Sequence, residues 1–400
     1  MTSDFRIHIR EWLREHGPHA PPDPHALPAG ADLEPAKAWQ LACYEAGLVG
    51  TNWPKAYGGH GLGEAERRIV LEESAPYNLG EGTFTVAVGM AGPTILDIGT
   101  EAQKLRYIRP LLRGDELWCQ LYSEPAAGSD VAGIRTSARQ MPDGSWRING
   151  QKVWTSGAQH ADVGVIITRT DPSVPKHRGL TKFIIDMRQP GIEVRPLRVA
   201  SGETPFNEVF FDDAVVEEDA VLGEVNGGWA AVVAMLRHER MAIAELGLPQ
   251  NRLLSPANLA QEARRRGRGD DPRVVAEIVD LFVREKALTA VLLRLDAELE
   301  AGIDSGPVDS IAKIAANQLN ERAGELAIEL MGPEVLTPTT PGVTDLFRVH
   351  LDSIGHAIGG GTSQVQKNII AERRHRLPKD PSPDRRTPFN ELPSSPKAAP

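Results

Sequence analysis

The character of the chain changes at the stretch Gln120-Leu121-Tyr122-Ser123-Glu124-Pro125-Ala126-Ala127-Gly128-Ser129-Asp130. Its first residues have the composition of a β-strand, and the small and hydroxyl-bearing residues that follow indicate a turn. Gly128 lets the backbone approach a ligand closely, and Ser123, Ser129 and exposed N–H groups can hold carbonyl or phosphate oxygens. The alternative is a plain connection between a strand and a loop.

Downstream of this stretch, from about residue 116 to residue 225, apolar and polar residues alternate as they do in strands. Pro142-Asp143-Gly144 predicts a hairpin turn. Short strands at such spacing are typical of a small barrel or sandwich. We expect strands over residues 145–150, 163–168, 182–186, 192–197 and 207–211.

A second hydroxyl-rich segment, Asn149-Gly150-Gln151-Lys152-Val153-Trp154-Thr155-Ser156-Gly157, follows within the same region. A tryptophan beside hydroxyl groups can stack on a planar ring while the hydroxyls bond the edge of that ring. The alternative is a tryptophan in the core of the barrel.

The sequence on both sides of this region is helical. Upstream, residues 36–46, 65–74 and 100–113 favour helices, the last of them opened by Thr100 as N-cap. Downstream, residues 229–245, 272–300, 307–330, 343–356 and 363–376 have helical composition, and apolar positions along 278–295 recur at helical spacing. We therefore predict an α+β chain with a helical N-terminal domain (1–115), a middle β-barrel domain (116–225) and a C-terminal four-helix bundle (226–379). Residues 380–400, with six prolines, predict a disordered tail.

Composition excludes several functional classes. Of 400 residues, 41% are hydrophobic, and a net charge of −10 provides no global basic field for nucleic acid or anionic membranes. Cys43 and Cys119 stand alone, so neither a disulfide framework nor a cysteine-based metal site is expected. No apolar run approaches the roughly 20 residues that span a bilayer, and the charged first residues are unlike a signal peptide. We expect a soluble cytoplasmic protein without a metal site.

Two further segments carry candidate chemistry. Gly359-Gly360-Gly361-Thr362-Ser363-Gln364 opens a predicted helix, where glycines permit close backbone approach and the helix N-terminus attracts anions; a flexible loop is the alternative. His238-Glu239-Arg240 lies inside the helix that begins near residue 227. Such a run is ordinarily a solvated salt-bridge patch, but a desolvated Glu239 becomes a useful base.

In this order and spacing, the segments resemble the acyl-CoA dehydrogenase family. The resemblance extends from Trp53 to about Lys379, and the fold that it implies has the same three parts. The stretches that carry it are residues 53–61, 99–104, 123–130, 149–157, 210–213, 223 with 227–229, and 361–364 with 369–373.

The resemblance implies FAD between the β-domain and the bundle, and oxidation of an acyl-CoA thioester to the trans-2-enoyl thioester. A carboxylate removes the α-proton while the β-hydrogen leaves as hydride to the flavin. By position, the flavin contacts are Gln120, Leu121, Tyr122, Ser123 and Ser129, then Trp154, Thr155 and Ser156, then Thr362 and Gln364. Ser129 also faces the substrate.

The resemblance implies the position of the catalytic base through two departures from the family's usual pattern, and these departures agree with each other. Many members carry it as a glutamate directly before the Gly-Thr that is here Gly361-Thr362, but this chain has Gly360 at that position. In isovaleryl- and long-chain-type members the glutamate instead precedes an arginine on the first long helix of the bundle. Glu239 matches that position, which makes Glu239 the predicted base and Arg240 a predicted substrate contact. The backbone N–H of Gly360 can still bond the thioester oxygen.

Other departures concern the neighbouring subunit's flavin. The family's Arg-x-x-Phe-Gly motif is absent from residues 251–273, which instead carry Arg264-Arg265-Arg266-Gly267-Arg268. Glu329-Leu330-Met331-Gly332-Pro333 stands where the family has Gln-x-x-Gly-Gly. The chain thus resembles one member of a hetero-oligomer in which two different chains share FAD, as in bacterial relatives that act on bulky thioesters.

The resulting prediction is a FAD-dependent dehydrogenase for a branched or bulky acyl-CoA, in a homo- or hetero-oligomer, that passes electrons to an electron-transferring flavoprotein. Two alternatives stay open. One is a flavin-dependent enzyme of secondary metabolism that acts on a carrier-bound acyl group or as an oxygenase, and the other is a non-catalytic subunit that completes another chain's flavin site.

Overall fold

The computed structural model describes residues 2–21, 30–74, 76–77, 79, 84–246, 253–301, 303, 306–337, 341–379 and 386–392. The chain divides into two compact units. The first comprises residues 1–239 with 380–400, and the second comprises residues 240–379. Each unit is described by itself.

The first unit begins with helices. Ile9 and Leu13 are fully buried and pack with Val70, so that α1 and α3 share a small core. The N-terminus of α6 is closed by a capping box, in which Thr100 and Gln103 each satisfy a backbone N–H of the other. The helices are α1 (Thr2–His16), α2 (Glu34–Glu45), α3 (Glu64–Ser74), a π-helix (Thr85–Ala91), α5 (Gly92–Ile98) and α6 (Glu101–Arg113).

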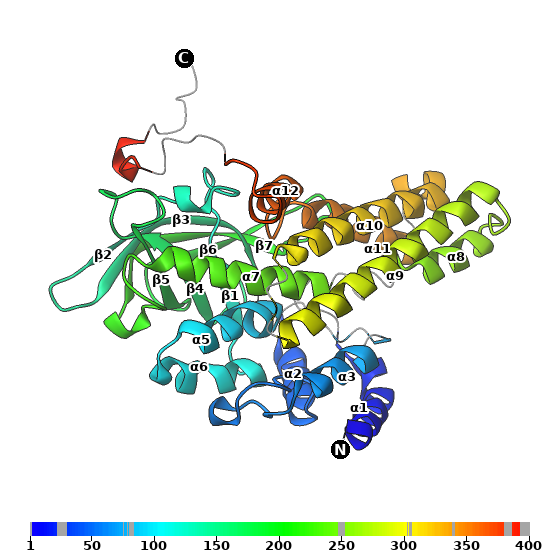
Figure 1. Ribbon diagram of the computed structural model, residues 1–400, viewed down its shortest axis with the longest axis horizontal. Coiled ribbons are helices and arrows are strands. Elements are labelled where there is room, and N and C mark those ends of the chain that lie inside the picture. Colours follow the sequence, from blue (N-terminus) through cyan, green and yellow to red (C-terminus); the bar gives the residue numbers. More distant parts are fainter. Residues whose placement is uncertain are drawn as a thin grey trace, which may run out of the picture. The chain divides into compact units, whose positions relative to one another are not determined.

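A seven-stranded sheet forms the middle of this unit (Figure 1). Its order is β1-β4-β2-β3-β7-β6, with β5 paired to β4. β1 runs parallel to β4, and β3, β7 and β6 are antiparallel neighbours. The strands are β1 (Trp118–Leu121), β2 (Ser137–Gln140), β3 (Trp146–Ser156), β4 (Val163–Arg169), β5 (Leu180–Asp186), β6 (Ile192–Leu197) and β7 (Phe206–Val216).

The two faces of the sheet are buried in separate cores because strand side chains alternate. Val165 and Leu180 face a core shared with α5, α6 and the start of α7 (Gly228–Leu246). Ile166 and Phe183, which point to the other side of the same strands, face the core enclosed by the curved sheet. β4 is therefore buried at every position, as a strand covered on both faces must be.

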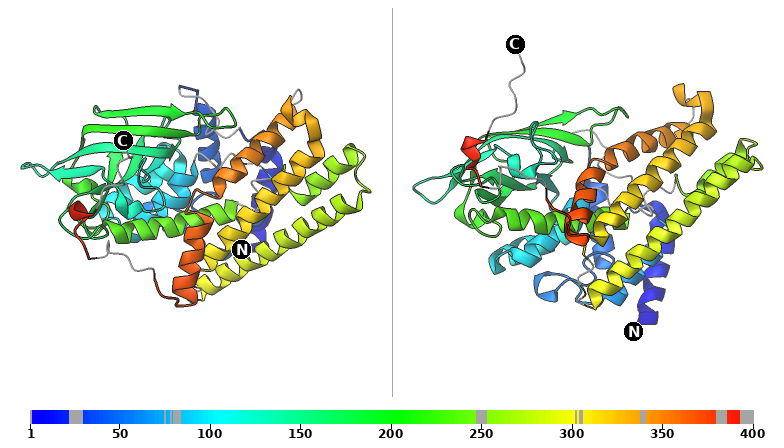
Figure 2. Two further views of the ribbon diagram at one scale, coloured as in Figure 1. Left: turned by 90° about the horizontal axis from the view of Figure 1, so that it is seen from above. Right: turned by 45° about the horizontal axis from the view of Figure 1, so that its top comes forward.

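The second unit is a helical bundle. Figures 1 and 2 show α8 to α11 side by side, and α10 packs against α9 and α11. Leu281 and Ala312 are fully buried in its core. The helices are α8 (Pro256–Arg265), α9 (Pro272–Glu300), α10 (Val308–Met331), α11 (Pro341–His356) and α12 (Ser363–Ile369). Among the described helices, none is both long enough and apolar enough to cross a membrane.

The predicted α+β class with a helical, a β and a second helical part is confirmed. The predicted boundary at residue 226 differs from the packing, because Val232 and Met235 of α7 belong to the core of the first unit. The predicted helix ranges do not cover α1, the π-helix, α5 or α8.

The prediction of a disordered tail is wrong for residues 386–392. Phe389 is buried and begins a short 3-10 helix, Phe389–Glu391. Its N–H donates to Val174 O at 2.9 Å, and the N–H of Asn390 donates to Pro172 O at 3.0 Å. One aromatic ring between prolines is enough to dock this segment, although composition gives no sign of it. The rest of the predicted tail lies outside the described residues.

Candidate active site

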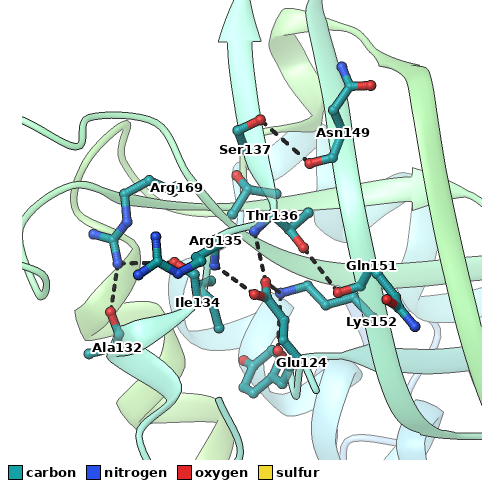
Figure 3. Close-up of polar contacts among 12 residues, drawn as sticks. Glu124, Ala132, Ile134, Arg135, Thr136, Ser137, Asn149, Gln151, Lys152 and Arg169 are labelled. Carbon is teal, nitrogen blue, oxygen red and sulfur yellow. Dashed lines mark hydrogen bonds and ion pairs between the residues drawn. The ribbon is translucent and has the colours of Figure 1, made fainter. Parts of the chain in front are cut away.

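A buried ion pair holds the two hydroxyl-rich segments side by side (Figure 3). Lys152 on β3 is fully buried, and its Nζ lies 2.9 Å from Oε1 of Glu124 and 3.0 Å from Tyr122 O. Glu124 also accepts the N–H groups of Arg135 and Thr136 at 2.6 and 2.9 Å. The N–H of Val153 donates to Ser123 O at 2.9 Å. The loop after β1 and the end of β3 are therefore fixed to each other.

The charges of this pair compensate each other. Burial alone raises the pKa of Glu124, but the charge of Lys152 and the N–H donors together bring that pKa below its ordinary value. Burial lowers the pKa of Lys152 to about 8, against the opposing effect of Glu124. Glu124 is consequently ionised at neutral pH, and Lys152 supplies its counter-charge.

Trp154 stands out from the sheet. Its side chain is 59% exposed and its φ is +59°, a backbone conformation that bulky residues rarely adopt. It lies where the pairing of β3 with β7 shifts register between Lys152 and Thr155, and its ring meets Phe206 edge-on. The alternative of a tryptophan in the barrel core is wrong, because the bulge turns the side chain outward. Backbone strain of this kind concentrates at ligand sites.

The residues beside Trp154 are less exposed. Thr155 is buried, and its Oγ1 has no hydrogen-bond partner among the described residues. The carbonyl oxygen of Thr155 accepts a hydrogen bond from Asn207 Nδ2 at 3.0 Å. Ser156 is half-buried opposite Phe206, and Ser129, at the exposed end of the loop after β1, is open to solvent. The Thr155 hydroxyl and the exposed indole together offer a hydrogen-bonding group and a flat apolar surface that suit a planar ring.

Side chains alternate between the two faces of β1 and the residue after it, so the predicted flavin contacts Leu121 and Tyr122 point to opposite sides. Leu121 is buried in the core enclosed by the sheet, so only its peptide group can reach a ligand. Tyr122 faces α7, where its hydroxyl contacts Met235 Sδ at 3.2 Å. Lys182 of β5 is fully buried there and donates to the same sulfur at 3.1 Å and to Ala231 O at 3.3 Å. Burial holds the pKa of Lys182 well below its ordinary value.

Glu239 lies one helical turn beyond Met235, on the side of α7 that faces β1. Nε2 of Gln120 donates to Oε2 of Glu239 at 3.2 Å, and both side chains are partly buried. Oε1 of Gln120 is buried without a hydrogen-bond partner among the described residues. The preceding residue, His238, instead contacts Asp97 at 2.8 Å near the surface. Within the segment His238-Glu239-Arg240, the expectation of a surface contact to a carboxylate therefore fits His238, whereas the Glu239 carboxylate accepts a hydrogen bond from the Gln120 amide.

The predicted residues of the second unit surround the start of α12. Gly360 and Gly361 both have positive φ, of +64° and +88°, which favours glycine. Gln366 Nε2 and the fully buried Lys313 hold the carbonyls of Gly360 and Gly361 at 2.9 and 2.7 Å. Thr362 caps α12 by accepting the N–H of Val365, and Gln364 is exposed. The loop is therefore fixed by buried side chains, contrary to the alternative of a flexible connection.

The other predicted residues of this unit form ion pairs within it. Nε of Arg240 lies 2.7 Å from Oδ2 of Asp309, so Asp309 engages the guanidinium that we predicted to contact substrate. Glu329 lies 2.9 Å from Arg268 and also pairs with Arg273. The pKa of Glu329 falls below its ordinary value, first because of its bond to Arg273. The arginine-rich segment and Glu329, which are the two departures from the family's flavin-contacting motifs, are therefore joined by ion pairs.

Comparison with known proteins supports the family that the sequence resembles. Residues 3–115, 119–214 and 226–375 match the acyl-CoA dehydrogenase N-terminal, middle and C-terminal domains. Acyl-CoA dehydrogenase IpdE1 of Mycolicibacterium smegmatis (strain ATCC 700084 / mc(2)155) is 33% identical over 398 residues, which cover 95% of this chain and 98% of the relative. The chain belongs to the acyl-CoA dehydrogenase family. It is an oxidoreductase of this flavoprotein family.

Two solved acyl-CoA dehydrogenase structures extend the comparison. The Tcur3481-Tcur3483 steroid ACAD is 26% identical with a TM-score of 0.82, covering 95% of this chain and 98% of that one. The ChsE4-ChsE5 complex from Mycobacterium tuberculosis is 27% identical with a TM-score of 0.78, covering 94% of this chain and 98% of that one.

Two residues that organise the site of this acyl-CoA dehydrogenase, Glu124 and Lys152, were not predicted, and for Gln120 only a flavin contact was predicted. Glu124 and Lys152 lie inside the two quoted segments, but alternation places Lys152 and Trp154 on the same face, so the sequence gives no sign that Lys152 is buried and Trp154 exposed. The side-chain role of Gln120 toward Glu239 has no local signal, because the two residues are 119 positions apart. The described residues contain no group of three or more His, Cys, Asp or Glu placed to hold a metal ion.

Proposed function

We propose that this chain is a FAD-dependent dehydrogenase that converts a branched or bulky acyl-CoA into the trans-2-enoyl thioester. The observation that carries the proposal is the partly buried Glu239 carboxylate, held by the Gln120 amide beside the end of β1. A carboxylate withdrawn from water and fixed in direction is suited to remove an α-proton. The similarity to a steroid ACAD supports a bulky acyl group.

The residues of the first unit fit a flavin. Trp154 exposes its ring on a strained bulge, the Thr155 hydroxyl supplies a polar group next to it, and Ser129 on the loop after β1 is open to solvent. The contacts proposed from position are Gln120, Leu121, Tyr122, Ser123 and Ser129, then Trp154, Thr155 and Ser156, then Thr362 and Gln364.

FAD, when held by these residues, would supply the acceptor for the β-hydrogen as hydride. Glu239 takes the α-proton onto a carboxylate oxygen, and Gln120 keeps that carboxylate in place. The backbone N–H of Gly360 donates to the thioester oxygen and so stabilises the negative charge that develops there. Arg240 remains bonded to Asp309 and positions the helix beside Glu239. The electron acceptor that we propose is an electron-transferring flavoprotein in the cytoplasm.

The first measurement is the absorbance spectrum of the chain purified alone and with its partner chain, followed by anaerobic addition of CoA thioesters of different acyl size to the form that contains flavin. We expect the flavin band to bleach with a branched or bulky thioester, because electrons enter the flavin. A flavin-containing protein that no thioester bleaches, alone or with its partner chain, would contradict the proposed reaction.

We also infer that the active assembly is a hetero-oligomer. Arg268 and Arg273 are paired with Glu329, and Arg268 also pairs with Asp271, so two carboxylates balance the two arginines and this cluster offers a neighbouring flavin no net positive charge. The structurally similar ChsE4-ChsE5 is a complex of two chains. Flavin should copurify stoichiometrically only after co-expression with a second acyl-CoA dehydrogenase chain, and full occupancy in a homo-oligomer made alone would contradict this inference.

Replacing Gln120 by Leu should slow flavin reduction, because the apolar side chain can no longer hold the Glu239 carboxylate in its direction. Stopped-flow measurement of flavin reduction checks this, with Gln120→Asn as the conservative variant. A weaker affinity for FAD with an unchanged rate of reduction in the flavin-containing protein would instead make Gln120 a flavin contact only.

A further inference from the structure

Residues 386–392, the C-terminal strap, lie on the turn between β4 and β5. The N–H of Phe389 donates to Val174 O at 2.9 Å, and Pro388 forms an isolated β-bridge with Pro175. Phe389 is only 8% exposed. Backbone pairing together with a buried ring gives the strap one register on the turn, so its attachment is specific.

The Phe389 ring covers a buried cation. The guanidinium carbon of Arg169 lies 3.9 Å from the centre of the ring, and that of Arg135 lies 5.3 Å from it. Burial is the main cause that lowers the pKa of Arg169, to about 10, so the group remains charged at neutral pH. An aromatic face stabilises a guanidinium that is withdrawn from water. The ring therefore offsets part of the free-energy cost of burying Arg169.

Arg169 in turn fastens the turn between β4 and β5 to the loop after β1. Its two terminal nitrogens donate to Lys176 O and Ala132 O, each at 2.6 Å. Its backbone N–H donates to Thr136 O at 2.7 Å. Lys176 also pairs with Asp130 through a contact of 2.7 Å. The strap, the turn and the loop are thus joined in one cluster around a single guanidinium.

The loop that this cluster holds, residues 122–136, carries proposed flavin contacts. Ser129 is exposed on this loop and directly precedes Asp130. Near the far end of the loop, the N–H of Arg135 donates to Glu124 at 2.6 Å, and Glu124 pairs with Lys152 (Figure 3). An exposed stretch of loop has few buried contacts of its own and takes its position from the groups that fasten it. The position of Ser129 therefore depends on the side chains that the strap covers.

We propose that Phe389 is a positioning residue for the loop 122–136, so that the C-terminal strap contributes to holding the cofactor. The inference rests on the proposed function, because the flavin contacts Ser123 and Ser129 are proposed there. A loop that is ordered before its ligand arrives spares the ligand the cost of ordering it. Removing the ring should therefore loosen the loop and speed the release of FAD, although Phe389 itself is not among the proposed FAD contacts.

Hydrogen exchange followed by mass spectrometry tests the first step. It uses the full chain with its flavin, including the partner chain where flavin requires it. Peptides that cover residues 122–136 report on the loop, and peptides from β6 and β7 report on the rest of the sheet. In Phe389→Ala, amides of the loop should exchange about tenfold faster or more, while those of β6 and β7 keep their wild-type rates. Phe389→Tyr keeps the ring and should exchange as the wild type does.

The second step is measured as the rate at which FAD leaves the protein, followed by the recovery of flavin fluorescence on dilution. We expect release about tenfold faster in Phe389→Ala, and a rate near that of the wild type in Phe389→Tyr. The matched control is Phe5→Ala, which removes a partly buried ring of the same unit, but from the small core shared by α1 and α3. This control should release FAD at the wild-type rate.

Four results would overturn the proposal. They are unchanged exchange in the loop of Phe389→Ala, faster exchange in that loop with unchanged release of FAD, equally fast release in Phe5→Ala, and equal loosening in Phe389→Tyr. Faster exchange spread evenly over the loop, β6 and β7 would also overturn it, because the strap would then stabilise the fold without positioning the loop.

Neither measurement uses a thioester, which separates this inference from the proposed function. A flavin-containing wild type that no thioester reduces would refute the proposed dehydrogenation, while exchange and FAD release would still decide the role of Phe389. Normal flavin reduction in the wild type, together with wild-type FAD release in Phe389→Ala, would overturn the role of the strap alone.

Discussion

Replacing Glu239 by Gln is expected to stop flavin reduction by acyl-CoA while the protein keeps its fold and its flavin. The amide has nearly the same shape as the carboxylate and can still bond Gln120, but it cannot accept the α-proton. General bases contribute factors of about 10² to 10⁴, so we expect a loss of at least that size in the rate of flavin reduction. Anaerobic stopped-flow absorbance with a thioester that bleaches the wild-type flavin measures it directly.

Asp97→Asn is the matched control. It also exchanges a carboxylate for an amide beside α7, but Asp97 is bonded to His238 near the surface. Flavin reduction in this variant should remain close to that of the wild type. Normal reduction in Glu239→Gln would show that Glu239 is not the base, and the reading of this chain as a non-catalytic subunit would then be preferred.

The second large effect concerns stability. Lys152→Met leaves the Glu124 carboxylate buried without its counter-charge. Breaking a buried ion pair in this way costs about 3–5 kcal/mol, so the variant should unfold at a clearly lower temperature and express poorly. Replacing both partners, as in Glu124→Leu/Lys152→Met, should recover part of the loss, because no unpaired charge remains. Thermal and denaturant unfolding followed by circular dichroism compare the variants.

Lys182→Met is the control for the loss of a buried lysine as such. Lys182 is equally buried, but its described contacts are a carbonyl and a methionine sulfur. Methionine of similar volume should be tolerated there with little change in stability. If Lys182→Met destabilises the protein as much as Lys152→Met, lost packing and not the unpaired Glu124 accounts for the effect.

The elements of the fold followed from local patterns because those patterns act over a few residues. Thr100 was predicted as a helix cap and is one, and residues 192–197 form a strand as the alternation indicates. Glu239 was singled out by its place before Arg240 on a helix. The structure adds that the carboxylate faces an amide.

The remaining features depend on contacts between distant parts of the chain. Trp154 is exposed because a bulge reverses the side on which one residue of β3 points, and no periodicity rule anticipates that reversal. The docking of Phe389 requires the positions of Arg135 and Arg169, more than 200 residues earlier. The neutralisation of Glu329 likewise requires the turn after α8 to meet α10. Such pairings are properties of the folded chain.

The two compact units meet in sequence inside α7, and this has a consequence for how members of such a family diversify. The first half of α7, through Met235, is anchored on the sheet, and Glu239 is the last residue of that unit. The proposed base therefore takes its register from the β-domain, together with Gln120. On the proposed function, substitutions confined to the second unit would leave the carboxylate and its amide partner in place, so the reaction could be preserved while that unit diverges.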